Sequence, residues 1–188
     1  MKILRIALFA SLFISSLIGG GTVMMRLENF NEKYEEIKGV DANVISALQE
    51  IRFVQEKYFE VNNAYAEDWQ TLNSFSDTGR VPIVEVSEEV LTVGGKDQIT
   101  VKIDTLNVLS VHEVATESFK YYDGQFKNLG IVPVSRDTFK LYTAKRRGEY
   151  FIEVLDGSPV NPQRGEKGKL KPLRFGSKAV PSVKGNWE

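Results

Sequence analysis

The fold is decided by residues 40–65, whose sequence is VDANVISALQEIRFVQEKYFEVNNAY. Apolar residues recur in it at steps of three or four, which is the spacing of one face of an α-helix. The positions that we predict to be buried are Val44, Leu48, Ile51, Val54 and Tyr58. Further apolar residues widen this stripe, so we expect this part of the helix to pack against a sheet. The pair Asn62-Asn63 marks the predicted end of the helix.

Upstream of this stretch, the helical pattern continues through residues 26–38 with a narrower apolar strip. The strip consists of Leu27, Phe30, Tyr34 and Ile37, and most of the intervening residues are charged or polar. A narrow strip at these steps is typical of a seam between two helices, so these four residues are the candidate assembly interface. The alternative is a solvated helix that contacts only its own domain. The long amphipathic helix as a whole is predicted over residues 26–65.

The segment that precedes the helix is strongly apolar. Residues 6–25 contain no charged residue and follow Lys2 and Arg5. A helix of about 20 residues spans the roughly 30 Å hydrocarbon core of a bilayer. We therefore predict a transmembrane anchor within residues 1–25, with a cytoplasmic N-terminus and the following domain periplasmic or extracellular. The alternative is a signal peptide that ends near Gly19-Gly20-Gly21, whose cleavage would leave a secreted protein.

The part of the chain after the helix has the pattern of β-structure. Residues 66–159 are predicted to form a small antiparallel sheet domain, in which apolar and polar residues alternate. Gly94-Gly95 supplies the turn of a hairpin over residues 89–103, and a second hairpin joins residues 138–143 to 149–154. The sequence thus predicts an α+β fold, with a transmembrane helix that continues into a long amphipathic helix packed on a small antiparallel sheet.

Three shorter segments complete the predicted organisation. Residues 106–111 are expected to form a further strand, and residues 114–122 one or two helical turns. Residues 160–188 form a loop-rich segment, in which residues 170–175 add an edge strand. This segment is basic, with Arg164, Lys167, Lys169, Lys171, Arg174, Lys178 and Lys184 against Glu166 and Glu188. Such an excess favours contact with acidic lipid, glycan or another copy of the chain, unless the segment is simply solvated.

Composition excludes several classes of function. The chain has 188 residues, with 24 Lys and Arg against 25 Asp and Glu, and this balance argues against a nucleic-acid partner. It has no cysteine and a single histidine, which excludes disulfides, thiolate metal sites and sites with two imidazoles. We therefore expect no cofactor and no metal.

Two local motifs come close to known chemistry but lack essential parts. His112-Glu113 begins like the helix of zinc proteases, but Thr116 stands where the second histidine is needed. We expect His112 at the surface, at the end of a strand. Asp156, Ser158 and Asn161 offer oxygen atoms to a cation in one loop, yet their spacing matches no calcium loop and a polar turn is preferred. The sequence therefore predicts no catalytic residues and a protein that is not an enzyme.

The order of elements resembles that of type IV pilins and pseudopilins. The local likeness lies in the segment from Gln55 to Tyr65, QEKYFEVNNAY, which is followed by Trp69 and Leu72. Pseudopilins often close their first helix with a similar Tyr and Asn-Gly-x-Tyr pattern, and here Asn63 takes the place of the glycine. The chain also lacks the basic leader and the glutamate near the start of the mature helix. The resemblance implies a pilin-like shape more than a pilus subunit.

Two functions are expected from these observations. The first is a single-pass structural or scaffold protein that projects a pilin-like extracytoplasmic domain and assembles through its N-terminal helix. Its partners would be the lipid bilayer and either itself or other envelope or filament proteins. The second is an exported, non-enzymatic binding module that recognises a protein or glycan ligand. An enzyme ranks last, because no spacing of chemically reactive residues favours one.

Overall fold

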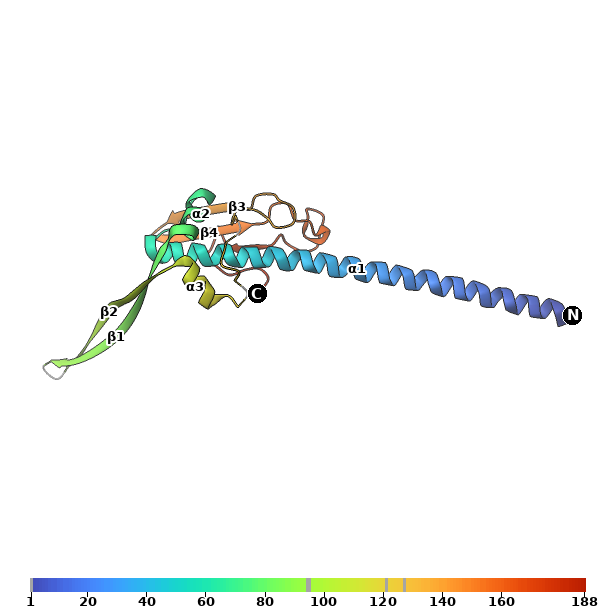
Figure 1. Cartoon of the computed structure of the whole chain (residues 1–188), viewed down its shortest axis with the longest axis horizontal. Coiled ribbons are helices and arrows are strands. Elements are labelled where there is room, and N and C mark those ends of the chain that lie inside the picture. Colours follow the sequence, from blue (N-terminus) through green and yellow to red (C-terminus); the bar gives the residue numbers. More distant parts are fainter. Residues whose placement is uncertain (1, 94–95, 121, 127) are drawn as a thin grey trace. The chain divides into compact units, whose positions relative to one another are not determined.

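The computed structural model describes the backbone of residues 2–93, 96–120, 122–126 and 128–188. Side chains are described for these residues except 2–25, 27, 29–31, 86, 88–93, 96–100 and 103. The described chain is an α+β protein with three α-helices and small antiparallel sheets (Figure 1). It divides into two units, Met1–Ala42 and Asn43–Glu188.

The first helix, α1, runs over Lys2–Asn62. Its last turn is closed by the two asparagines that were predicted to end it. The Asn62 side chain donates to the Tyr58 carbonyl at 3.0 Å. Asn63 takes the left-handed conformation with φ 51°, and its N–H donates to the Phe59 carbonyl at 2.8 Å. Asparagine tolerates this conformation better than most other side chains do, so the predicted end at Asn62-Asn63 is confirmed. The helix stops three residues before 65, the outer bound predicted for it.

The predicted membrane anchor, residues 1–25, lies outside the part of the chain whose side chains are described. Among the residues that are described, no helix has both the length and the apolar character needed to cross a bilayer.

The second helix, α2 (Trp69–Thr78), was not predicted from the sequence. Asp68 caps its first turn, where its carboxylate accepts hydrogen bonds from the N–H and the hydroxyl of Thr71, both at 2.8 Å. These bonds lower the pKa of Asp68. Leu72 and Ser76 are buried on the inner side of the helix.

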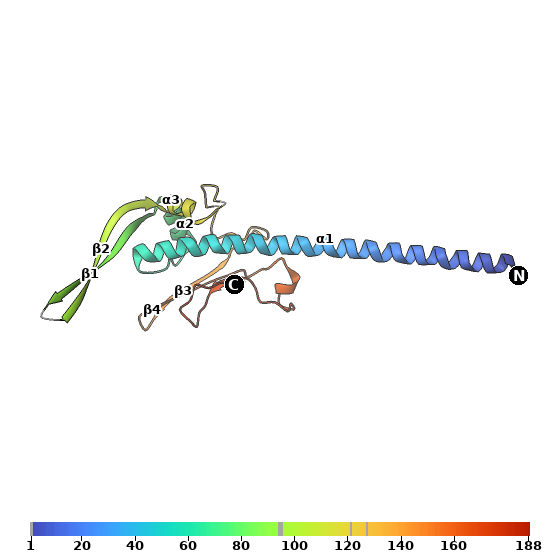
Figure 2. The ribbon, with the colours of Figure 1, turned by 90° about the horizontal axis from the view of Figure 1, so that it is seen from below.

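Two separate antiparallel sheets replace the single predicted sheet. The first has two strands, β1 (Arg80–Val93) and β2 (Lys96–Ser110), which form one long hairpin (Figures 1 and 2). The predicted hairpin over residues 89–103 is its outer half. The predicted strand over residues 106–111 belongs to β2 as far as Ser110, whereas Val111 begins the next helix. The pairing shifts by one residue between Ile83 and Val84, which is a β-bulge.

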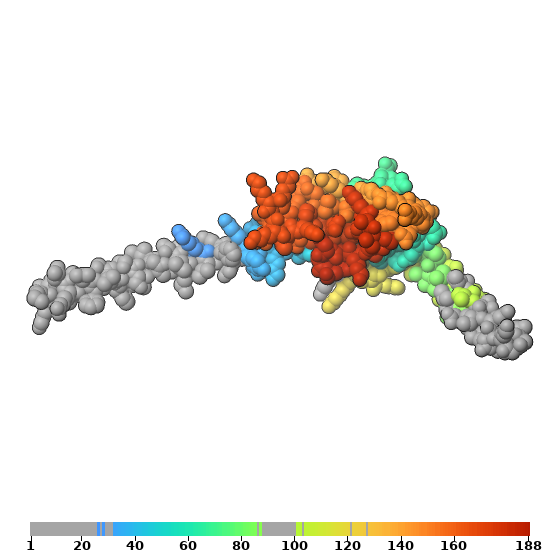
Figure 3. Space-filling view, turned by 180° about the vertical axis from the view of Figure 1, so that it is seen from behind, coloured from blue at the N-terminus to red at the C-terminus, as the bar shows by residue number. Residues whose placement is uncertain are grey.

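The second sheet has three strands in the order β3-β4-β5. β3 (Lys140–Arg146) and β4 (Glu149–Leu155) form the second predicted hairpin, which is confirmed. β5 (Arg174–Gly176) is an edge strand, shorter than the predicted one. The rest of the C-terminal segment is mostly irregular apart from a 3₁₀ turn, Pro162–Arg164. In Figure 3, this segment, drawn in orange to red, covers a continuous part of the second unit's surface.

The third helix, α3 (Val111–Ser118), begins three residues earlier than predicted, directly after β2. Its start is fixed by a capping box, in which Ser110 and Glu113 exchange hydrogen bonds. The Ser110 N–H and hydroxyl each donate to the Glu113 carboxylate at 2.7 Å. These bonds lower the pKa of Glu113.

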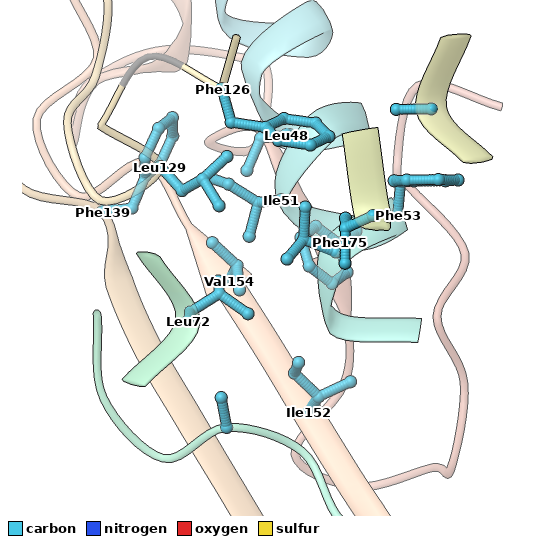
Figure 4. Close-up of a cluster of buried hydrophobic side chains, with 14 of the residues drawn as sticks. Leu48, Ile51, Phe53, Leu72, Phe126, Leu129, Phe139, Ile152, Val154 and Phe175 are labelled. Carbon is cyan, nitrogen blue, oxygen red and sulfur yellow. The ribbon is translucent and has the colours of Figure 1, made fainter. Parts of the chain in front are cut away.

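The core of the second unit lies between α1 and the β3-β4-β5 sheet. Four of the five predicted core residues, Val44, Leu48, Ile51 and Val54, are buried there, whereas Tyr58 is only partly buried and packs edge-on against Phe75. Figure 4 shows Leu48 and Ile51 of α1 near Val154 of β4. The same cluster contains Leu72, Val111, Ala115, Phe126, Leu129, Phe139, Ile152, Leu173 and Phe175. The predicted packing of the helix on a sheet is confirmed for this part of α1.

Candidate interaction surfaces

The predicted assembly seam is described at two of its four positions. Tyr34 is 55% exposed and Ile37 is partly exposed, while the side chains of Leu27 and Phe30 lie outside the described residues. The other described residues from Glu32 to Lys38 are exposed, and Glu35 and Lys38 form an exposed ion pair at 3.8 Å. The aromatic ring of Tyr34 is therefore exposed to water, and the described residues next to it on the helix are charged.

The β1–β2 hairpin carries a second exposed apolar surface. Residues paired in register lie on the same side of a hairpin. By this rule Pro82 and Val108 share one side with Val84 and Thr105, and Val101 belongs to the same side. All five are exposed, with Val84 at 47%, Val101 at 54% and Val108 at 48%. We call these five residues the outer face of the hairpin.

The other side of the hairpin has a different character. At its base, Val81 is buried and its register partner Leu109 packs against the core. Farther along, Glu85 pairs with Asp104, and Lys102 forms an ion pair with Asp104 at 3.1 Å. The outer face, to whose side the register also assigns Glu88 as the partner of Val101, is therefore opposite a side that is packed at its base and charged beyond it.

The basic C-terminal segment contains a groove of about 570 Å³, formed within residues 157–172. Its lining includes Arg164, Lys169 and Lys171 together with Glu166. Arg164 donates to the Lys171 carbonyl at 2.9 Å, which links the middle of the loop to its C-terminal part. The groove is thus a basic concavity within one loop.

The candidate cation ligands of this loop are used to hold its backbone. Asp156 and Asn161 are buried, and each accepts a hydrogen bond from the N–H two residues later, on Ser158 at 3.1 Å and on Gln163 at 3.0 Å. These are Asx turns, so the polar-turn interpretation is confirmed for both residues. The described residues contain no group of three or more His, Cys, Asp or Glu side chains able to hold a metal ion.

Part of the positive charge of the C-terminal segment is neutralised within the fold. Arg174 forms an ion pair at 2.6 Å with Glu153, a buried residue of β4, and Lys178 lies 3.7 Å from the same carboxylate. The Glu188 carboxylate pairs with Arg52 of α1, which lowers the pKa of Glu188. No local sequence pattern indicates these pairs, because their partners are distant along the chain.

The single histidine was predicted to lie at the surface, at the end of a strand. The structure places it in an aromatic cluster instead. His112 lies in the first turn of α3, where its Nδ1 is hydrogen-bonded to the Tyr122 hydroxyl. Its ring stacks on the ring of Phe126, with 5.5 Å between the two ring centroids. Burial, with Asp123, Glu50 and Asp77 nearby, raises the pKa of Tyr122 to about 12. A neutral tyrosine hydroxyl therefore faces the imidazole over the physiological pH range.

A second groove has a volume of about 480 Å³. It lies between residues 43–50 of α1 and the loop that carries Asn128 and Arg136. Its helical wall is made of Asn43, Ser46, Ala47 and Glu50. Asn128 and Arg136 both have positive φ, at 41° and 62°. The lining of this groove includes the charged residues Glu50 and Arg136.

Comparison with known protein families, with curated proteins and with solved structures finds no match to this chain.

Proposed function

We propose that this chain is a membrane-anchored structural protein with a pilin-like extracytoplasmic domain. In this proposal residues 6–25 lie in the bilayer and the N-terminus is cytoplasmic. The strip Leu27, Phe30, Tyr34 and Ile37 of α1 contacts copies of the chain or other envelope or filament proteins. The observation that carries the proposal is the 55% exposure of Tyr34 on a helical strip directly after an apolar run.

The energetics of this strip support a partner. A tyrosine ring that is transferred from water into an interface contributes a large buried area, and aromatic side chains are enriched at protein interfaces for this reason. The described residues around Tyr34 are charged and exposed, which keeps the rest of this helical surface in water. The order of elements, a long N-terminal helix followed by small antiparallel sheets, supports the likeness in shape to pilins.

The proposal is non-enzymatic, and the structural roles of the residues with the most distinctive chemistry support it. The single histidine bonds to Tyr122, Asp156 and Asn161 hold the turns of a loop, and Glu153 pairs with Arg174. An assembly role needs none of these groups to be free.

The experiment that tests the anchor is membrane extraction followed by intact mass measurement. We expect the full-length chain to remain in the membrane pellet after an alkaline carbonate wash, with the mass of all 188 residues. A protein found in the soluble extracytoplasmic fraction, shortened by about 20 residues, would overturn the proposal, because that is the length of an apolar segment that a signal peptidase removes.

A second candidate function, an exported binding module for an acidic glycan or protein, is favoured by one observation. The groove within residues 157–172 brings Arg164, Lys169 and Lys171 to one concave surface. We expect that function to require the two lysines. Titration calorimetry with an acidic oligosaccharide tests it, with Lys169→Ala and Lys171→Ala combined as the variant and Lys120→Ala, outside the groove, as the control. Equal heats for variant and control would eliminate this candidate.

A further inference from the structure

We infer that the solvent-facing side of the β3-β4-β5 sheet binds the carboxylate groups of an acidic polysaccharide. The inference rests on the proposed function only in placing this part of the chain outside the membrane, where it would meet such polymers. It assigns the binding to a surface that neither of the two candidate functions uses. The occupant is a linear polymer of uronic acids, whose carboxylates repeat along its length.

The two sides of the β3-β4-β5 sheet carry different residues. Alternate residues of a strand point to opposite sides, and residues paired in register share a side. One side, with Leu141, Ile152 and Val154, packs into the core. The opposite side carries charged and aromatic residues, which are Lys140, Tyr142, Arg146, Glu149, Phe151, Glu153 and Arg174. We call these residues the cationic face, together with Lys178, whose Nζ lies 5.0 Å from the centre of the Tyr142 ring.

The cationic face holds more positive charge than its own carboxylates neutralise. Two carboxylates stand against four cations, which are Lys140, Arg146, Arg174 and Lys178. One carboxylate, that of Glu153, is already paired with Arg174 at 2.6 Å and with Lys178 at 3.7 Å, and its residue is 6% exposed. The other acidic residue, Glu149, is exposed. The excess of cations favours an anionic ligand.

Arg146 keeps its charge available to a ligand because its hydrogen bonds go to neutral groups. It donates to the Tyr142 hydroxyl and to the Lys178 carbonyl, the latter at 3.3 Å. Its guanidinium lies 5.6 Å from the ring centre of Phe151 and 5.9 Å from that of Tyr142. Such contacts hold the group in place without cancelling its charge. A guanidinium that is already ordered loses less entropy on binding, and its planar fork matches the two oxygens of a carboxylate.

The cationic face is elongated, which favours a polymer over a single small anion. Lys140 and Arg146 are six residues apart in β3, which corresponds to about 20 Å along a strand. At Lys140 the face adjoins the basic groove within residues 157–172. Gly157 lines that groove, and a Cβ added to it would lie 2.5 Å from the Lys140 Cε atom. A polymer with one carboxylate on each sugar would reach several of these cations at once, and each contact would strengthen the next.

The burial of the aromatic rings argues against a membrane as the occupant. A protein surface that docks on a bilayer inserts apolar side chains beyond its charged groups. On the cationic face, Phe151 is 7% exposed and Tyr142 is partly buried, whereas the Lys178 side chain is 59% exposed. The cations therefore reach farther into solvent than the rings do, as binding of a hydrated polyanion requires.

The experiment titrates oligogalacturonate into the full-length chain, held in nanodiscs of zwitterionic lipid, and measures Kd by calorimetry. The variant combines Arg146→Gln with Lys178→Gln. The control combines Lys33→Gln with Lys38→Gln, which removes the same charge from exposed positions of α1. We expect the variant to raise Kd by roughly tenfold or more, because it removes two charged hydrogen-bond donors, and the control to leave Kd unchanged.

Removal of an acidic residue provides an independent readout. Glu149→Gln is expected to lower Kd, because it takes away an exposed carboxylate that repels the ligand. Glu117→Gln, at an exposed position of α3, makes the same change elsewhere and is expected to have no effect on Kd. A merely structural role of Glu149 would not strengthen binding. Circular dichroism of each variant checks that it is folded.

The outcomes separate the cationic face from other ligands and from the proposed function. Absence of binding to the wild-type chain, equal Kd values for variant and control, or equal binding of a neutral oligosaccharide would overturn the inference. Binding of phosphatidylglycerol vesicles instead of oligogalacturonate, lost in the Arg146 and Lys178 variant, would replace the polysaccharide by an anionic membrane. Loss of binding only when Lys169 and Lys171 are substituted would assign the ligand to the groove. A chain that binds oligogalacturonate through Arg146 and Lys178 but is not retained in membranes would remove the proposed function and leave this site standing.

Discussion

Gln55 and Ala66 are joined by two reciprocal hydrogen bonds inside the core. The Gln55 Nε2 group donates to the Ala66 carbonyl at 3.1 Å, and the Ala66 N–H donates to Gln55 Oε1 at 2.9 Å. Both residues are 1% exposed. The side-chain amide thus satisfies the backbone of the loop that follows α1, as a neighbouring strand would. This explains why a glutamine occupies a position of the apolar stripe.

Loss of this amide is expected to destabilise the second unit. Gln55→Leu would leave a buried N–H and a buried carbonyl on Ala66 without partners, at a cost of about 2–4 kcal/mol in the free energy of unfolding. Urea denaturation of the full-length chain measures the change. Gln70→Leu, at an exposed position of α2, is the control and is expected to stay within about 0.5 kcal/mol of wild type. A Gln55→Leu variant as stable as this control would show that the reciprocal pair contributes little.

The buried stripe of α1 makes a prediction about packing. Leu48 is fully buried, so Leu48→Ala is expected to lower the free energy of unfolding by about 2–5 kcal/mol through lost burial and a cavity. Val61→Ala, near the exposed end of the same helix, serves as the control and is expected to change stability by less than about 0.5 kcal/mol. Thermal unfolding followed by circular dichroism compares the two. Similar losses in both would contradict the position of the core.

Gly176 in β5 is predicted to tolerate no side chain. Its φ is +75°, and a Cβ there would lie 2.1 Å from the Ile152 carbonyl oxygen. Gly124 has a similar φ of +88° but nothing within 4 Å of the added atom. Gly124→Ala therefore measures the conformational cost alone, about 1–2 kcal/mol, and Gly176→Ala should cost about 3 kcal/mol or more. Equal unfolding midpoints for the two variants would contradict the close approach of β5 to β4.

The raised pKa of Tyr122 predicts a stability change at high pH. Its value of about 12 in the folded chain exceeds the ordinary 10.0, so the folded state holds this proton more tightly than the unfolded state. The resulting stabilisation is complete below about pH 10 and is lost as the pH rises toward about 12. Urea denaturation at several pH values, with wild type and Tyr122→Phe, measures it. We expect the stability difference between the two to change above pH 10 in the direction that disfavours wild type. A constant difference would contradict the assignment.

Long periodic patterns were the most predictable part of this fold. The stripe Val44, Leu48, Ile51 and Val54 gave the buried face of α1, because helical spacing over many residues leaves few alternatives. The end at Asn62-Asn63 and the β3–β4 hairpin followed from local turn chemistry. Short elements were harder: α2 was missed although Asp68 is a helix-capping residue, and the Ser110-to-Glu113 capping box would have placed the start of α3 correctly.

The division of the strands into two sheets and the exposure of the β1–β2 hairpin could not be predicted from the sequence. Alternation in β1 shows that its two sides differ, but not which side the rest of the chain covers. The pairs Arg174–Glu153 and Arg52–Glu188 join residues that are far apart along the chain, so no local pattern could reveal them. Of the predicted seam, Tyr34 and Ile37 are placed by the described structure, and their partner stays a prediction.

The central claim, assembly through the seam of α1, is tested most directly by cysteine crosslinking at Tyr34 in intact membranes. Tyr34→Cys places a single thiol on the seam, and Glu32→Cys places it about 200° around the same helix as the matched control. We predict a specific crosslinked product, with a second copy or another envelope protein, from Tyr34→Cys and at most a trace from Glu32→Cys. Equal yields from the two positions, or no product from either, would contradict the claim.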